Sequence, residues 1–217
     1  MPRIPLFTPE SMTAEQERVY RAVVDGPRGV VVGPLRAALH RPELADCWQR
    51  FGAILRYGTS LPARLTELAI VVTARRWNSQ LEWHIHAEAA RRAGIDPAAL
   101  DAILAGEPPR FADPEEADIY EFARQLQQSG NVAEAVYQRV MARWGNVGVV
   151  ELGAVIGYYT LVSMTLNVHE IPLPDGVNAP LPPIAHAHSA QESLPTLAPA
   201  WAAQEASPDV ATAGKDR

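Results

Sequence analysis

Two carboxylates and two imidazoles, Glu67, Glu82, His84 and His86, stand close together in the centre of this sequence. Carboxyl and imidazole groups serve as general acids and bases, because burial and neighbouring charges move their pKa values. Glu82 and His86 are four residues apart, so a helix places both on one face, whereas His84 falls on another face. The same spacing is typical of an ordinary ion pair on a helix surface, so it does not by itself define a site.

These residues fall on two predicted helices joined by a turn at 77–79. The first begins after Pro62, which suits the first helical turn, and is apolar on nearly every face as far as Ala74. Glu67 lies inside that run. A carboxylate buried there must be paired, hydrogen-bonded or neutral, because burying an isolated charge is costly. The second helix is predicted over Gln80–Ala93, with a glycine as its C-terminal stop.

The stretch RLTELAIVVTARRWNSQLEWHIHAEAARRAGI resembles the core of the carboxymuconolactone decarboxylase family, which includes the alkylhydroperoxidase-D-type proteins. Redox members of that family carry a Glu, a C-x-x-C pair and a His at fixed spacing. On this chain the Glu falls on Glu67 and the His on His86, while the cysteine positions fall on Ser79 and Glu82. The E-W-x-x-H form resembles a branch without the thiols. The similarity continues through RYGTSLPARLTELAI upstream and VELGAVIGYYTLVSMTLNVHEIPLP downstream.

The resemblance implies cofactor-free decarboxylation of a small unsaturated lactone or carboxylic acid, and therefore a lyase. Such a reaction needs an apolar place for the departing carboxylate, stabilisation of the electrons left behind, and a proton for carbon. As a hypothesis, His86 donates to the carbonyl or delivers the proton, Glu82 orients its ring, and Glu67 is the acid if protonated. The expected substrate-contacting residues are Trp83, Tyr57, Tyr158 and Tyr159, although the position of Tyr57 favours simple packing over a role in the site.

Three alternatives stay open. Thiol-dependent peroxide reduction, of the peroxiredoxin type, occurs in other family members, but the one cysteine, Cys47, is expected to be a small buried hydrophobe. A non-catalytic oligomer that binds a small molecule is the second, and isomerisation or dehydration of a related acid is the third. No metal or cofactor is expected, because Glu82 and His86 supply two ligands and a third is not evident.

The 217 residues suggest one all-helical bundle of seven or eight helices over residues 1–172, with the alkylhydroperoxidase-D-like fold that the resemblance implies. A Pro/Ala-rich tail over 173–217 follows, and it is expected to be disordered. The histidines at 186 and 188 are expected to be exposed there. A net charge of −6 and the lack of a basic stripe argue against nucleic-acid binding. The lack of a signal pattern and the single cysteine favour the cytoplasm. The resemblance also implies a homotrimer or homohexamer.

The other helices are predicted from caps and periodicity over 13–25, 42–57, 96–105, 115–128, 133–144 and 147–168. The last is apolar enough to raise the question of a membrane span, but its internal Glu151 and polar residues favour a core helix. The loop GPRGVVVGP lacks the Lys and Ser/Thr of a phosphate-binding loop and is interpreted as a turn segment. Whether the ligand is an acid depends on which nearby arginine faces the pocket, among Arg56, Arg64, Arg75 and Arg76.

Overall fold

The structure, a computed structural model, describes residues 1–182 and 194–197. Over these residues it consists of eight α-helices and one short 3-10 helix, without a β-strand, which confirms the predicted all-α class. The 3-10 helix spans Pro9–Ser11. The α-helices are α1 (Ala14–Val24), α2 (Leu35–Ala38), α3 (Pro42–Tyr57), α4 (Ala63–Arg76), α5 (Gln80–Arg92), α6 (Pro97–Ala105), α7 (Pro114–Ser129) and α8 (Glu134–His169).

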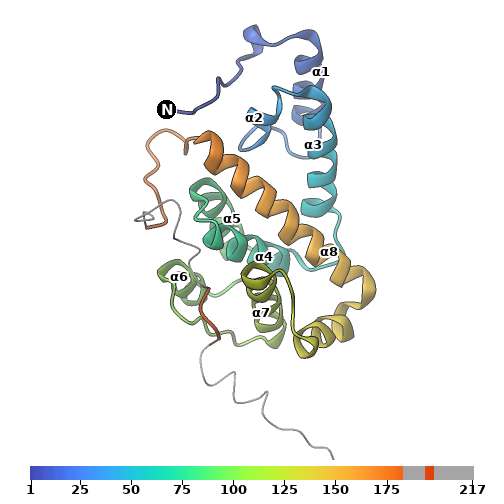
Figure 1. Ribbon diagram of the computed structural model, residues 1–217, viewed down its shortest axis with the longest axis vertical. Coiled ribbons are helices and arrows are strands. Elements are labelled where there is room, and N and C mark those ends of the chain that lie inside the picture. The colour runs from blue at the N-terminus through green and yellow to red at the C-terminus, as the bar shows by residue number, and fades with distance from the viewer. Residues whose placement is uncertain (183–193, 198–217) are drawn as a thin grey trace, which may run out of the picture.

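The long helix α8 runs diagonally through the molecule, with α1–α3 on one side and α4–α7 on the other (Figure 1). Helix α4 packs against α5, α7 and α8, and α8 also packs against α3. The middle of α4 is buried on every face, from Leu68 at 0 % exposure to Ala74 at 1 %. As its apolar sequence predicted, α4 is the central helix of the bundle.

The turn between α4 and α5 sets the relative position of the two carboxylates. Trp77 ends α4, and Asn78 takes a left-handed conformation with φ 48°. Asparagine tolerates this region better than most residues. The amide of Ser79 then donates to the carbonyl oxygen of Ala74 (2.9 Å), and α5 begins at the next residue. The predicted helix–turn–helix over 62–93 is therefore present, and its two helices lie side by side (Figure 1).

Helix α8 covers the two helices predicted over 133–144 and 147–168. A kink lies at the predicted boundary between them, where Gly145 has φ 63° and ψ −170°, far from helical values. Glycine reaches this conformation without the steric cost that a side chain would bring. By length and composition α8 is one candidate membrane span in the described residues, but half of its most apolar window is buried among the other helices. Glu151 accepts bonds from the amide and hydroxyl of Ser60 (2.8 and 2.6 Å), which ties α8 to the start of α4.

One prediction about α3 was wrong, because Cys47 was expected to be buried and is exposed. Two apolar side chains of the same helix, Leu44 and Phe51, are also 52 % and 47 % exposed. Only one face of α3 is covered, because the helix lies at the edge of the bundle against α1, α2 and α8. The outer face of α8 is similarly apolar, at positions that follow a three-four spacing: Val147, Val150, Gly157, Leu161, Met164 and Val168 are all exposed.

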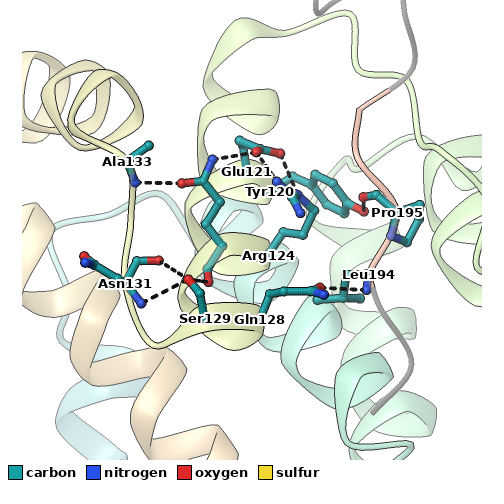
Figure 2. Close-up of polar contacts among 10 residues, drawn as sticks. Tyr120, Glu121, Arg124, Gln128, Ser129, Asn131, Ala133, Leu194 and Pro195 are labelled. Carbon is teal, nitrogen blue, oxygen red and sulfur yellow. Dashed lines mark hydrogen bonds and ion pairs between the residues drawn. The ribbon is translucent and has the colours of Figure 1, made fainter. Parts of the chain in front are cut away.

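Parts of the predicted tail contact the helical domain. Leu181 is 2 % exposed, and its backbone exchanges hydrogen bonds with the Gln80 side chain (2.9 and 3.1 Å). Further along, Figure 2 shows residues 194 and 195 against α7, where Gln128 accepts from the amide of Leu194 (3.2 Å) and Tyr120 donates to the carbonyl of residue 195 (2.8 Å). The histidines at 186 and 188 lie outside the described residues, so the expectation for them stays a prediction.

Candidate active site

A buried histidine between two carboxylates forms the centre of the site. His86 Nδ1 donates to Glu67 Oε2 at 2.6 Å, and His86 Nε2 lies 3.2 Å from Glu82 Oε2. The His86 and Glu82 side chains are 3 % and 5 % exposed, and the Glu67 side chain is 13 % exposed. Glu67 comes from α4, whereas Glu82 and His86 come from one face of α5. The three predicted catalytic residues therefore lie in contact.

The two carboxylates determine the charge of the imidazole. Burial by itself lowers the pKa of His86, but hydrogen bonds and charge interactions with Glu67 and Glu82 outweigh burial, so the pKa is raised from its usual 6.5. Because each ring nitrogen faces a carboxylate oxygen, the imidazolium can donate at both ends. The protonated Nε2 of His86 therefore lies next to Glu82.

A cavity of about 30 Å³ adjoins the Glu82 end of the Glu67–His86–Glu82 set. This is room for about one or two water molecules, so a larger ligand enters only when the lining side chains move apart. His86 and Glu67 do not line it; Glu82 does. The loop over residues 26–34 closes one side. Gly33, with φ 58°, brings this loop so close that an added Cβ would lie 3.9 Å from Glu82 Oε1. Within the described structure, Glu82 is the member of the Glu–His–Glu chain that borders the cavity.

Two tyrosines of α8 form the aromatic wall of the cavity. The Tyr159 ring meets the His86 ring edge-on at 4.9 Å, and the Tyr158 ring lies 5.3 Å from that of Tyr159. Burial raises the pKa of Tyr158, although Arg28 opposes the shift, and burial raises the pKa of Tyr159 well above 10. Both hydroxyls therefore stay protonated at neutral pH.

The other two predicted contact residues do not reach the cavity. Tyr57 is 50 % exposed at the end of α3 and is not among the lining residues. Trp83 is 3 % exposed but packs in the core instead. A residue directly beside Glu82 on a helix points about 100° away from it, so adjacency in sequence was a poor guide to the wall of the cavity.

Two arginines border the cavity, Arg56 and Arg28. Sequence reasoning named the first and missed the second. The signal for Arg28 is that it is the one charged residue of the loop GPRGVVVGP. Arg64 instead pairs with Asp113 and Glu115 at 2.9 and 2.6 Å. The two remaining candidates bind backbone oxygens, Arg75 those of residues 103 and 104 and Arg76 that of residue 127.

Thiol chemistry and metal-ion chemistry both need side chains that the site does not bring together. The thiol of Cys47 is exposed on α3 and does not line the cavity. Ser79, at one of the family's cysteine positions, is 0 % exposed, and its hydroxyl has no hydrogen-bond partner in the described residues. Among those residues no group of three His, Cys, Asp or Glu side chains is arranged to hold a metal ion.

Solved structures share the fold at low sequence identity. The alkylhydroperoxidase AhpD core of an uncharacterized peroxidase-related protein from Ralstonia eutropha JMP134 has 16 % identity and a TM-score of 0.66, over 80 % of this chain and 93 % of that one. A second peroxidase-related protein, from Silicibacter sp. TM1040, has 14 % identity and a TM-score of 0.63, over 79 % and 91 %. The debrominase Bmp8 in complex with 2,3,4-tribromopyrrole has 14 % identity and a TM-score of 0.62, over 82 % and 92 %. The chain therefore has the AhpD-like fold.

Residues 42–125 match the model of the carboxymuconolactone decarboxylase family. This confirms, for that segment, the resemblance to the carboxymuconolactone decarboxylase family that the sequence predicted, and the solved structures add the AhpD-like fold. The matched segment contains Glu67, Glu82 and His86, whereas Arg28 and the α8 tyrosines lie outside it. No curated protein matches the chain with significant similarity.

Proposed function

We propose that this protein is a cofactor-free acid–base enzyme that decarboxylates a small unsaturated lactone or carboxylic acid. The observation that carries the proposal is the unbroken contact from Glu67 through His86 to Glu82, at the edge of a cavity. The family match supports an enzyme at this position. Decarboxylation is favoured over other uses of the same groups because the lining residues Leu35, Ile85 and Val162 offer an apolar place in which a carboxylate loses its charge.

In this proposal Glu82 is the catalytic residue, because it borders the cavity. His86 lies behind it and supplies the proton that Glu82 delivers. Glu67 is a positioning residue, since its bond to Nδ1 fixes the orientation of the ring and supports the imidazolium. This differs from the hypothesis based on the sequence, in which His86 itself faces the substrate.

The proposed reaction balances without an added reactant. The bond between the ring carbon and the departing carboxylate breaks, and carbon dioxide leaves. The electron pair of that bond stays on the substrate as an enolate conjugated with the lactone carbonyl. The Nε2 proton of the His86 imidazolium passes to Glu82, which delivers it to carbon to form the new C–H bond. His86 then regains a proton from solvent. A hydrogen-bond donor near the carbonyl, such as the protonated hydroxyl of Tyr158, stabilises the enolate.

Peroxide reduction and simple ligand binding would each need a different set of residues. Thiol-dependent peroxide reduction needs a cysteine at the site, but Ser79 and Glu82 stand at the cysteine positions and Cys47 is exposed elsewhere. A purely binding role needs no proton chain, and it leaves the Glu–His–Glu contact unexplained. Isomerisation and dehydration of a related acid would use the same residues and differ from decarboxylation only in the product.

A turnover assay in heavy water tests the proposal. With carboxymuconolactone, the wild-type protein is expected to release carbon dioxide and to place one deuterium on the product carbon, whereas Glu82→Gln loses this activity because an amide transfers no proton. The exposed Cys47→Ser variant is the control and should keep wild-type activity. Hydroperoxide consumption that Cys47→Ser abolishes, without lactone turnover, would contradict the proposal. Ligand binding without any turnover would support the binding role instead.

We further infer that the protein forms a homo-oligomer, and the exposed apolar stripe of α8 supports this. The stripe repeats every three or four residues, which is the spacing at which one helix packs along another. Gly153 and Gly157 have no atom within 4 Å of an added Cβ, so a neighbouring helix has room to approach them closely. Size-exclusion chromatography with light scattering distinguishes the expected trimer from the expected hexamer.

A further inference from the structure

Charged groups of both signs border the cavity: a carboxylate of the Glu67–His86–Glu82 set and two guanidinium groups. Glu82 lies on its border, and Arg28 and Arg56 line it from the loop over 26–34 and from the last turn of α3. In the described residues neither guanidinium forms an ion pair with a protein carboxylate. Two cations that share a small, partly enclosed space favour an anion between them, since charges interact more strongly away from bulk water.

Arg28 has an unused donor at this position. Its Nη2 donates a long bond of 3.4 Å to the hydroxyl of Tyr158, while its Nε is buried with no hydrogen-bond partner in the described structure. A buried donor without a partner carries a cost and calls for a missing acceptor, such as a ligand or water. A carboxylate bound beside Arg28 would provide it.

Arg56 reaches the same cavity from the last turn of α3. Its guanidinium lies 5.6 Å from the ring centre of Tyr57, and its charge acts on Tyr159, where it opposes the rise in pKa caused by burial. Arg56 therefore has an aromatic partner that holds its position and leaves its N–H groups available.

Gly52 makes room for Arg28. A Cβ at position 52 would overlap both the Arg28 guanidinium and the Tyr158 hydroxyl. Glycine costs stability inside a helix, and here it provides the space in which a loop arginine lies against α3. The loop, α3 and α8 are thus fitted together around the positive side of the cavity.

We propose that Arg28 and Arg56 form an anion subsite that holds a carboxylate which the substrate keeps through the reaction. This rests on the proposed function. Two guanidinium groups stabilise a carboxylate in its charged form, so the carboxylate that departs as carbon dioxide must lie elsewhere, towards the apolar lining residues. The subsite orients the substrate with its reacting carbon towards Glu82. Arg28 lies outside the family segment over 42–125 and Arg56 lies inside it, so the N-terminal loop supplies one of the two guanidinium groups.

Titration with benzoate and its uncharged analogue benzamide, followed by NMR, tests the subsite directly. We expect wild-type protein to bind benzoate at least tenfold more tightly than benzamide, and Arg28→Gln and Arg56→Gln each to weaken benzoate binding about tenfold or more. Arg110→Gln removes an exposed arginine away from the cavity and should bind benzoate as the wild type does. Gly52→Ala displaces Arg28 together with the Tyr158 hydroxyl that it contacts and changes no charge, so it should weaken benzoate binding as Arg28→Gln does.

The outcomes separate this proposal from the proposed function. Equal binding of benzoate and benzamide to the wild type, or benzoate binding within twofold of wild type in both arginine variants, would overturn the subsite. His86→Gln should keep benzoate binding while losing turnover. If no lactone is turned over but benzoate binding still depends on both arginines, the subsite stands and the decarboxylation proposal fails. Circular dichroism identifies any variant that does not fold.

Discussion

Replacing His86 with glutamine is expected to lower kcat by about 10²–10⁴-fold, the usual contribution of general acid–base catalysis. Glutamine is of similar size and still donates a hydrogen bond, but it cannot accept and release a proton. The proton that Glu82 delivers to the substrate is then no longer supplied across the 3.2 Å contact behind it. Because the substrate does not touch His86, KM should change little. Steady-state kinetics with carboxymuconolactone measures both quantities.

His84→Gln is the matched control, because His84 lies on the same helix, two residues earlier, and on another face. It is half-buried and forms no part of the Glu–His–Glu chain, so its turnover should stay near wild type. If His86→Gln keeps more than about a tenth of the wild-type kcat, proton supply through His86 is not part of the mechanism. Removing the imidazolium leaves two carboxylates buried without a cation between them, so thermal unfolding of both variants must be compared first.

Replacing Leu68 with alanine is expected to lower the free energy of unfolding by about 3 kcal/mol, within the usual range for a buried leucine. Leu68 is 0 % exposed and lies beside Glu67 on the helix that contacts α5, α7 and α8. The surrounding helices cannot collapse fully into the cavity, because each is held by other contacts. Urea unfolding followed by circular dichroism measures the change.

Leu44→Ala makes the same chemical change on a side chain that is 52 % exposed, and it should cost less than about 1 kcal/mol. Equal losses for the two variants would mean that α4 is not the central helix of the bundle. Such a result would also weaken the account of the site, because the position of Glu67 depends on α4 being held on all sides.

The helices were predictable because their local signals agree with the tertiary structure. The helices predicted from caps at 13–25 and 96–105 do have those caps: Thr13 and Gln16 form a capping box, with bonds of 2.8 and 3.3 Å, and Asp96 caps α6. Gly145 breaks the helical conformation between the two predicted segments of α8. The faces of α3 were harder to assign, because apolar residues at helical spacing occur both in the core and on exposed surfaces such as that of Phe51.

The contact of Glu67 with His86 was partly predictable, since both side chains had to be buried on neighbouring helices and needed polar partners. Which of these residues borders the cavity was not predictable from the sequence. Glu82 borders the cavity because the loop over 26–34 closes on that side, and nothing local in the sequence of α5 specifies where a distant loop will lie. Arg28 was missed for the same reason, and its position depends on Gly52, 24 residues later in the sequence.

The central claim is that His86 is an imidazolium bonded at both ring nitrogens. Its pKa is raised from 6.5 in the folded protein, so the imidazolium stabilises the fold below pH 6.5 and this contribution is lost as the pH rises through the folded pKa. Nitrogen NMR of the imidazole across this pH range is the most direct measurement. The account predicts that both ring nitrogens of His86 are protonated at pH 6.5 and lose a proton only at higher pH. A His86 ring that is already a single neutral tautomer at pH 6.5 would contradict it.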